Sequence, residues 1–378
     1  MINKNEIPYW MALTHDSGWN YEQTNNFIMK INYEEKNSIE KFFDLSSNNW
    51  SDHFGFTKEE IETLEKVREN IPKYSFLAED LFEQGYEVIP IKSAEYPKIL
   101  KENLQFKSPP VLYVKGNRDI LKESSIAIVG SRNASKTALS FTDNIARLAS
   151  REHNVVVSGF AKGVDRQALD SALKYNCKSI IVLPQGILTF HSGFKEYYRQ
   201  IVGGNILVLS SFFPKAEWSV QLAMARNPVI YGLAKEIYVA ESGQKGGTWS
   251  GVIDGLRKKR DIYIRNPEPG ENNANNELIS RGAIAVNFEG QPVLEYKLIL
   301  PEISLVKEDE DKELDAIIFK VLGGKVAVTS KQILKKTNLN WSVRKLTDYL
   351  KTKKEIEILN KKPISFKLKD SGYQTKIS

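Results

Sequence analysis

Short apolar runs alternate with longer stretches of helical character through the middle of this 378-residue chain. Such runs are typical of strands buried on both faces of a parallel sheet, and strands that alternate with helices form right-handed βαβ units. The predicted fold class is therefore α/β, with a Rossmann-like, doubly wound and mostly parallel sheet over residues 86–300. The expected strands are 126–129, 155–157, 180–183, 206–209, 237–240, 262–264 and 283–286.

A helical N-terminal domain is predicted for residues 1–85. Apolar side chains from Ile61 to Ile71 recur at nearly helical spacing, and Thr57 followed by acidic residues is typical of a helix start. We expect Pro72 to end that helix, because proline lacks the N–H that a helix interior needs. A short strand is expected at 86–90.

The C-terminal residues 312–378 predict a winged-helix-like domain. Helices are expected at 314–322, 331–336 and 341–350, followed by a hairpin of strands 356–359 and 364–369. The third helix carries Arg344, Lys345 and Lys351, which suit phosphate contacts. A winged helix that docks a protein is the alternative, and the sequence does not separate the two.

The positive charge of the chain is concentrated near its C-terminus. Residues 320–369 hold fourteen basic and three acidic side chains, so their net +11 exceeds the +6 of the whole chain and leaves −5 for the rest. An acidic run at 308–311 precedes them, and residues 301–311 are predicted to form a linker. A basic module on an acidic body favours a nucleic-acid partner, although solvated lysine-rich surfaces are also common.

Composition excludes several other classes of protein. Cys177 is the only cysteine, which excludes an internal disulfide framework and a cysteine-based zinc cluster. The four histidines show no metal-ligand spacing, so no metal or cofactor is expected. No apolar run approaches the roughly 18 residues of a membrane span, and the first residues lack a signal-peptide core. We therefore expect a cytoplasmic protein without a membrane partner.

Glycine, hydroxyl groups and a cation follow the first predicted strand. Gly130, Ser131, Arg132 and Ser135 stand at its carboxyl end, which is where ligands bind in doubly wound sheets. Glycine permits a tight turn in which successive N–H groups point at an anion. The guanidinium of Arg132 presents a planar fork that suits phosphate oxygens.

The second predicted strand ends in a similar loop, with Ser158, Gly159, Lys162, Gly163 and Asp165. We expect Lys162 to bind an anion, because carboxyl ends of parallel strands share one edge of the sheet with the first loop. Asp165 either belongs to this site or complements the dipole of the following helix.

A third glycine-rich loop follows the fifth predicted strand. It contains Gly243, Lys245, Gly246, Gly247 and Thr248, and the helix before that strand carries Arg226 and Asn227. Together the three loops predict one phosphate-binding crevice. The chain has neither Gly-x-Gly-x-x-Gly nor Gly-Lys-Ser/Thr at these turns, which disfavours dinucleotide binding and a P-loop ATPase.

Several motifs also follow one another in a recognisable order. They are Gly-Ser-Arg at 130–132, Ser-Gly-x-Ala-Lys-Gly-Val-Asp at 158–165, Arg-Asn at 226–227, Glu-Ser-Gly at 241–243 and Asn-Glu-Leu-Ile at 276–279. This series resembles the DNA-processing protein A family (DprA or Smf) over about residues 86–290. Residues 1–85 then stand where that family places a SAM or helix-hairpin-helix domain.

The resemblance implies a protein that binds single-stranded DNA and forms a homodimer through its Rossmann-like domain. It implies protection of single strands and loading of a RecA-type recombinase in DNA uptake and recombination, as in natural transformation. Arg132 and Lys162 would contact DNA, and no catalytic residue is implied. Phe160 and Phe190 could stack on bases or pack beneath the loop.

The alternative is a nucleotide-sensing or LOG-like nucleotide-hydrolysing domain, used in a phage-defence or mobile-element system. Gly246, Gly247 and Thr248 resemble the phosphate loop of those domains. Hydrolysis there needs a carboxylate three residues after the threonine, and this chain has Gly251 at that position. We therefore expect no enzymatic activity, while nucleotide sensing stays open.

Overall fold

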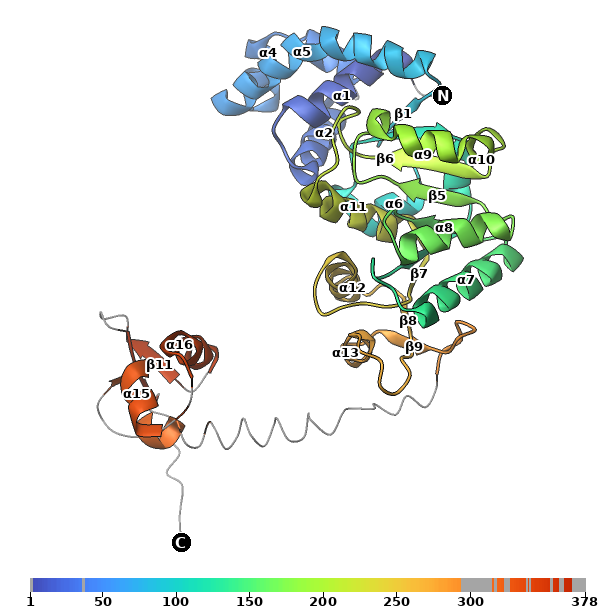
Figure 1. The fold of residues 1–378 in the computed structure, drawn as a ribbon. Coiled ribbons are helices and arrows are strands. Elements are labelled where there is room, and N and C mark those ends of the chain that lie inside the picture. The colour runs from blue at the N-terminus through green and yellow to red at the C-terminus, as the bar shows by residue number, and fades with distance from the viewer. Residues whose placement is uncertain are drawn as a thin grey trace. The chain divides into compact units, whose positions relative to one another are not determined.

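The computed structural model describes residues 3–35 and 38–293 and, nearer the C-terminus, residues 315, 318–322, 327–337, 339, 341–353, 356–359 and 364–368. The chain divides into two compact units, residues 1–298 and 299–378, which are described one after the other (Figure 1). The linker predicted at 301–311 lies outside the described residues. The domain boundaries at 85 and 300 remain predictions.

A nine-stranded sheet forms the centre of the first unit. Its strands are β1 (Glu87–Pro90), β2 (Val111–Gly116), β3 (Ser125–Val129), β4 (Val155–Ser158), β5 (Ser179–Val182), β6 (Ile206–Ser210), β7 (Glu236–Val239), β8 (Ile262–Arg265) and β9 (Ile284–Val286). They lie in the order β1-β2-β6-β5-β4-β3-β7-β8-β9. Strands β3 to β9 are parallel, whereas β2 pairs antiparallel with β6 and β1 with β2. The predicted α/β fold and its seven parallel strands are confirmed, and β2 is an additional strand that the pattern did not predict.

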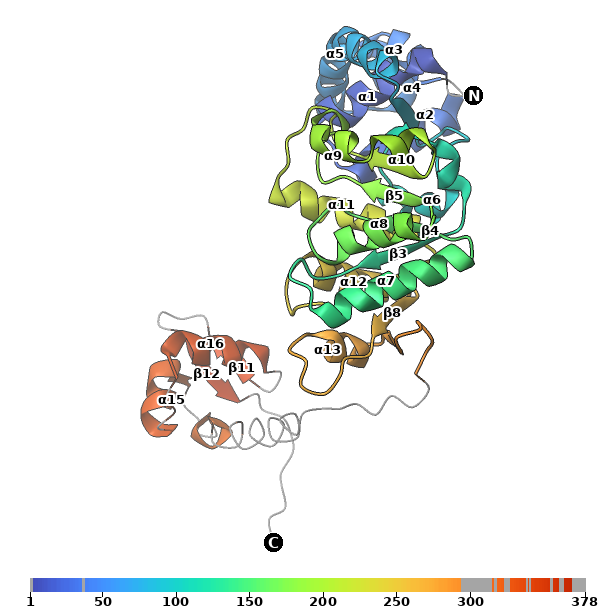
Figure 2. The same ribbon diagram turned by 45° about the vertical axis from the view of Figure 1, so that its right-hand side comes forward.

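Helices cover both faces of this sheet because its strands are apolar on both sides. Ile126 and Ile128 of β3 pack into the core beneath α7 (Lys136–Arg151) and α8 (Val164–Lys174). Ala127 and Val129 point into the opposite core, which also contains residues of α6 (Lys98–Leu104), α11 (Val220–Leu233) and α12 (Gly247–Arg257). Figure 2 shows α7 and α8 side by side on one face.

Shorter elements complete the α/β part of this unit. They are the helices α9 (His191–Glu196), α10 (Tyr198–Val202) and α13 (Asn275–Ser280), and the 3-10 turns η2 (Gln105–Lys107), η3 (Arg118–Lys122) and η4 (Ile187–Thr189).

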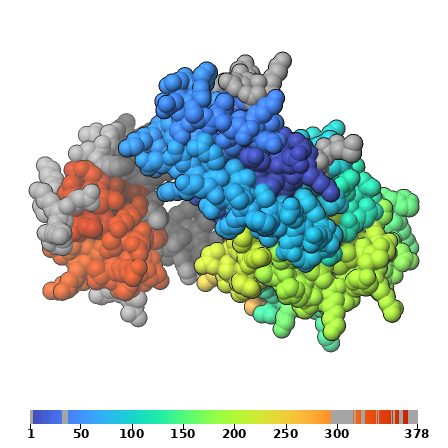
Figure 3. Space-filling model, turned by 90° about the horizontal axis from the view of Figure 1, so that it is seen from above, coloured from blue at the N-terminus to red at the C-terminus, as the bar shows by residue number. Residues whose placement is uncertain are grey.

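The N-terminal residues form a helical layer in the same unit. It contains η1 (Lys4–Glu6), α1 (Ile7–Asp16), α2 (Tyr21–Glu35), α3 (Ile39–Asp44), α4 (Ser47–Phe54) and α5 (Lys58–Glu83). Its buried aromatic side chains, such as Phe42 and Trp50, belong to one continuous core with Val88 of β1 and Tyr113 of β2. Figure 3 shows these helices, in blue, resting on the green and yellow α/β part.

Helix α5 corrects one sequence prediction. It begins as expected, with a capping box in which Thr57 Oγ1 accepts from the Glu60 N–H and the Glu60 carboxylate accepts from the Thr57 N–H. It does not end at Pro72, which lies inside the helix on an exposed side. The apolar stripe continues past the proline through Tyr74 to Leu81, and burial of that stripe offsets the lost backbone hydrogen bond.

The second unit contains a small antiparallel sheet and helices. The described elements are β10 (Val328–Thr329), α15 (Ser330–Thr337), α16 (Val343–Thr352), β11 (Ile356–Leu359) and β12 (Ser365–Leu368), with strand order β10-β12-β11. Arg344, Lys345 and Lys351 are exposed on α16. The assignment of residues 312–378 as a winged-helix-like domain stays a prediction.

Among the described residues, no helix combines the length and apolar character that a membrane crossing requires.

Candidate functional site

The central cavity lies where the strand order of the sheet reverses direction. Strands β3 and β7 are parallel neighbours, but the chain continues from β3 toward β4 on one side and from β7 toward β8 on the other. At such a switch point the two loops diverge and leave a crevice beyond the carboxyl ends of the strands. Here the crevice has a volume of about 410 Å³, which is enough for a small ligand or a segment of a larger one.

Most of the predicted site residues meet at this crevice. Ten of them line it: Gly130, Ser131, Arg132, Arg226, Asn227, Gly243, Lys245, Gly246, Gly247 and Thr248. The other five predicted residues, Ser135, Ser158, Gly159, Lys162 and Gly163, do not line it and support or flank its loops instead.

Three cations are exposed around the crevice. Arg132 and Lys245 line it from opposite loops, and Lys162 is exposed on the adjacent β4–α8 loop. Within the described ranges, none of the three side chains forms an ion pair or a hydrogen bond with the protein. Their charge is therefore available to an anionic ligand.

Glycine allows the β3–α7 and β4–α8 loops to touch. Gly163 has a φ of +80°, and a Cβ on it would lie 2.3 Å from the carbonyl oxygen of Ser131. The Ser131 carbonyl also accepts a hydrogen bond of 3.2 Å from the Val164 N–H. This contact holds Lys162 beside the loop that carries Arg132.

A buried ion pair lies beneath the crevice. The Nη2 of Arg226 is 3.7 Å from Oδ2 of Asp165, and its Nη1 donates to the Val182 carbonyl at 2.9 Å. Burial raises the pKa of Asp165, against the opposing effect of the Arg226 guanidinium. Because arginine keeps its proton in proteins, the Asp165 carboxylate is the group that balances it. A Cβ at Gly159 would fall 1.9 Å from Arg226 Nη1, so glycine is required there.

This pair gives Arg226 a different role from the predicted one. Although Arg226 lines the crevice, it is only 4% exposed, and its guanidinium contacts Asp165 and the Val182 carbonyl of β5. Ser158 is also withdrawn, because its hydroxyl donates to the Ile128 carbonyl at 2.8 Å and the residue is buried. Both residues shape the crevice from below.

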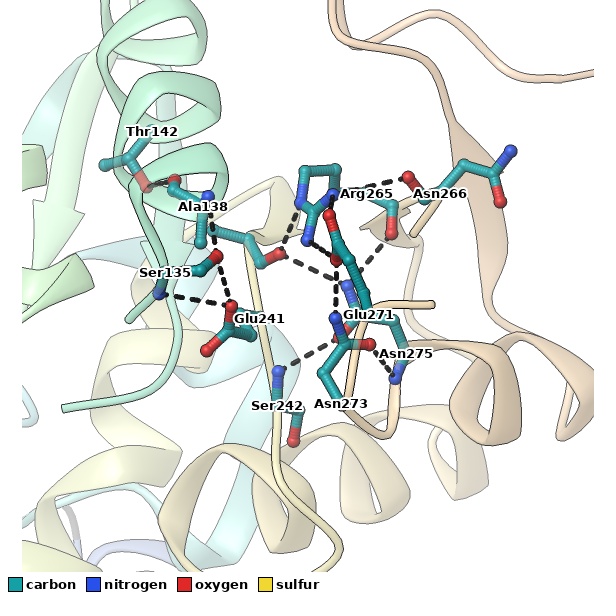
Figure 4. Close-up of polar contacts among 11 residues, drawn as sticks. Ser135, Ala138, Thr142, Glu241, Ser242, Arg265, Asn266, Glu271, Asn273 and Asn275 are labelled. Atoms are coloured by element: carbon teal, nitrogen blue, oxygen red, sulfur yellow. Dashed lines mark hydrogen bonds and ion pairs between the residues drawn. The ribbon is translucent and has the colours of Figure 1, made fainter. Parts of the chain in front are cut away.

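Ser135 is occupied by the protein itself. It is the N-cap of α7, where its Oγ accepts from the Ala138 N–H at 3.1 Å. Its hydroxyl donates to Glu241 Oε2 at 2.5 Å, and its N–H donates to the same oxygen at 3.2 Å (Figure 4). Ser135, which was predicted to bind phosphate, therefore links the β3–α7 loop to the β7–α12 loop.

A buried polar network fixes the base of the β7–α12 loop. Arg265 forms a two-pronged ion pair with Glu271 and donates from Nε to the Ala240 carbonyl (Figure 4). Burial acts to raise the pKa of Glu271, but the hydrogen bonds and charge of Arg265, together with hydrogen bonds from Asn273 and the backbone, hold that pKa below its usual value. Asn275 accepts from the Ser242 N–H at 3.0 Å and donates to the Ala240 carbonyl. Sequence reasoning did not identify this network.

Of the two alternatives for Phe160 and Phe190, stacking on bases or packing beneath the loop, the structure shows packing. Phe160 and Phe190 meet edge to face with ring centroids 4.8 Å apart, and Phe190 is buried. An apolar surface lies elsewhere, because Val220 and Met224 of α11 line the crevice at 61% and 42% exposure. Trp218, just before α11, is half exposed. These residues were not identified from the sequence.

Comparison with known proteins identifies a protein family. A family model described as DNA recombination-mediator protein A matches residues 87–296, which is more than half of the chain. The DNA processing protein DprA of Streptococcus pneumoniae is 32% identical over 201 residues, which cover 53% of this chain and 70% of that protein. The DNA processing protein DprA of Bacillus subtilis is 26% identical over 199 residues, covering 52% and 66%.

A solved structure has the same fold. The X-ray structure of DNA processing protein A from Streptococcus pneumoniae matches this chain with a TM-score of 0.61 and 25% sequence identity. The match covers 75% of this chain and 95% of that one, so it extends beyond the α/β part.

Proposed function

Since this chain belongs to the DNA recombination-mediator protein A family, we propose that its switch-point crevice binds the phosphates of single-stranded DNA. Family membership supports a DNA-processing role connected with recombination. The observation that carries the proposal is the set of cations that pair with none of the described residues, Arg132 and Lys245 on the crevice and Lys162 beside it. Cations that flank backbone amides at a sheet edge suit a flexible chain of phosphates.

An exposed apolar surface, suited to the bases of a single strand, lies beside these cations. Trp218, Val220 and Met224 are exposed and apolar, and the last two line the crevice. Apolar and aromatic surface beside a cationic groove binds unpaired bases without regard to sequence. A single strand can therefore lie with its backbone over the cations and its bases over the start of α11.

The geometry disfavours the hydrolase alternative. The position where such an enzyme carries its carboxylate is Gly251, and a Cβ there would lie 2.6 Å from the ring of Tyr231. Asp165, which lines the crevice, pairs with Arg226, and Glu241 beside it accepts from Ser135. Hydrolysis of a nucleotide is tested by an arm of the experiment below.

We extend the proposal to the wider role that the family suggests. The protein would protect single strands, act as a homodimer through its α/β part, and pass strands to a RecA-type recombinase. Light scattering on the purified protein tests the dimer. Recombinase filament formation on protein-coated single strands, measured with and without this protein, tests the loading step.

The central experiment measures binding of a fluorescein-labelled oligothymidine by anisotropy. We expect Arg132→Ala and Lys162→Ala each to weaken binding about tenfold, because each removes one phosphate contact. The slope of log K against log salt should fall by about one for each substitution. Lys66→Ala, an exposed lysine on α5, is the matched control.

Two outcomes would contradict the proposal. One is a wild-type protein that does not bind the oligonucleotide, and the other is a double Arg132→Ala, Lys162→Ala variant that binds as tightly as Lys66→Ala. Release of free base from thymidine monophosphate would favour the hydrolase instead. Deleting residues 306–378 asks whether the basic C-terminal region adds affinity.

A further inference from the structure

Glu241 joins both ends of the β3–α7 loop to β7. Its carbonyl oxygen accepts a hydrogen bond of 2.8 Å from the Ser131 N–H at the start of that loop. Its carboxylate Oε2 accepts from both the N–H and the hydroxyl of Ser135 at the loop's end. One residue therefore sets the spacing of the two loops that border the crevice.

The Glu241 carboxylate also occupies a position that favours an anion. Helix α7 is 16 residues long and Ser135 is its N-cap, and the N-terminus of a helix attracts negative charge through its free N–H groups and its dipole. A phosphate oxygen could accept from the same two donors, the N–H and the hydroxyl of Ser135. With the carboxylate in place, both of these donors are occupied.

The residues on either side hold Glu241 in this position. The Ala240 carbonyl accepts from Arg265 Nε at 3.0 Å and from Asn275 Nδ2 at 3.2 Å, and the Ser242 N–H donates to Asn275 Oδ1. Gly243 to Gly246, by contrast, are exposed. Hydrogen bonds on both sides therefore hold Glu241 in place, while the part of the loop that carries Lys245 faces solvent.

We infer that Glu241 is a built-in competitor of the DNA strand, which keeps phosphates off the N-terminus of α7 and confines them to the Arg132 and Lys245 side of the crevice. This inference rests on the proposed function. It makes Glu241 a positioning residue that limits affinity, so its removal should strengthen binding. A residue with a merely structural role would weaken binding when replaced.

The test compares four variants for binding of the labelled oligothymidine. Glu241→Gln removes the charge but keeps an oxygen that can accept from Ser135, and Glu241→Ala removes both. Glu241→Asp keeps the charge, and Glu79→Gln removes an exposed carboxylate from α5. At about 50 mM salt we expect Glu241→Gln and Glu241→Ala to bind about two- to fivefold more tightly than wild type, with a smaller gain at about 300 mM. Glu241→Asp and Glu79→Gln should show no gain.

The possible outcomes separate this inference from the proposed function. Wild-type protein that does not bind the strand would defeat the proposed function, and the inference with it. Wild-type binding together with Gln and Ala variants that bind no better than Glu79→Gln would overturn the inference alone. Thermal melting of each variant confirms that it is folded. Because Glu241→Gln and Glu241→Ala both lack the charge, one of them still tests the inference when the other does not fold.

Discussion

Arg226 and Asp165 form an ion pair that is almost completely withdrawn from water, with side chains 5% and 11% exposed and an N–O distance of 3.7 Å. The pair lies under Gly159, which has no side chain to occupy the same space. It joins α11 to the first turn of α8, and Arg226 reaches β5 through the Val182 carbonyl. The floor of the crevice is therefore a polar contact among three elements.

Removing the cation of this pair should destabilise the folded protein. We expect Arg226→Met to lower the free energy of unfolding by about 3–5 kcal/mol, because it leaves the buried Asp165 carboxylate without its cationic partner. Urea unfolding followed by circular dichroism measures the effect. Adding Asp165→Asn should restore part of the stability, since no buried charge is then left. A loss below about 1 kcal/mol for Arg226→Met would show that the pair contributes little.

Gly163→Ala should separate the two loops that it joins. A φ of +80° is strained for alanine, at a cost of about 1–3 kcal/mol, and the added Cβ would overlap the Ser131 carbonyl. Gly246→Ala is the control for stability, because its φ is +96° but no atom lies within 4 Å of the added Cβ. We expect urea unfolding to show a larger loss for Gly163→Ala. Equal losses would mean that the loop contact is unimportant.

His15 should make stability fall in mild acid. It packs among Tyr74, Tyr113 and Phe213 and lies 2.8 Å from the Tyr113 hydroxyl, and burial lowers its pKa to about 3. Between that value and the usual pKa of about 6.5, only the unfolded chain binds the proton. Stability is therefore complete above about pH 6.5 and decreases as the pH falls toward 3.

The measurement is urea unfolding at about pH 7 and pH 5.5. We expect the wild type to lose about 1 kcal/mol more than His15→Gln over this interval. His53→Gln, which replaces an exposed histidine, should behave as wild type. The same pH dependence in all three proteins would show that His15 is not the source of the loss of stability in acid.

The only thiol of the chain should be unreactive in the folded protein. Cys177 is buried, its Sγ donates to the Asn154 carbonyl at 2.9 Å, and burial raises its pKa to about 11. Because the thiolate is the reactive form, Ellman's reagent at pH 8 should give colour only after denaturant is added. Immediate stoichiometric reaction of the native protein would contradict this.

Much of the fold follows from local patterns in the sequence. Each parallel strand from β3 to β9 coincides with an apolar run, because a strand buried on both faces carries mostly apolar side chains. The capping box at Thr57 is likewise local, since its two partners lie three residues apart. The family motifs in residues 86–290 are local as well, and the match to residues 87–296 confirms them.

The functions of individual residues within those motifs depend on distant contacts. Arg226 has the same chemistry as Arg132, but one is buried against Asp165 and the other faces solvent. Ser135 and Glu241 are 106 residues apart and meet because β3 and β7 are neighbours in the sheet. Helix α5 passes Pro72 because packing of its later turns outweighs a local preference.

The amino-acid sequence thus specifies the strands, the glycine turns and the supply of cations at one sheet edge, because these depend on neighbouring residues. Which cations remain free, and which serine is already occupied, depends on how β7 lies against β3 and how α11 packs under Gly159. Those contacts arise from burial and charge pairing among segments far apart in the chain. For that reason the crevice could be predicted from its loops, while the division of its residues between binding and support required the folded molecule.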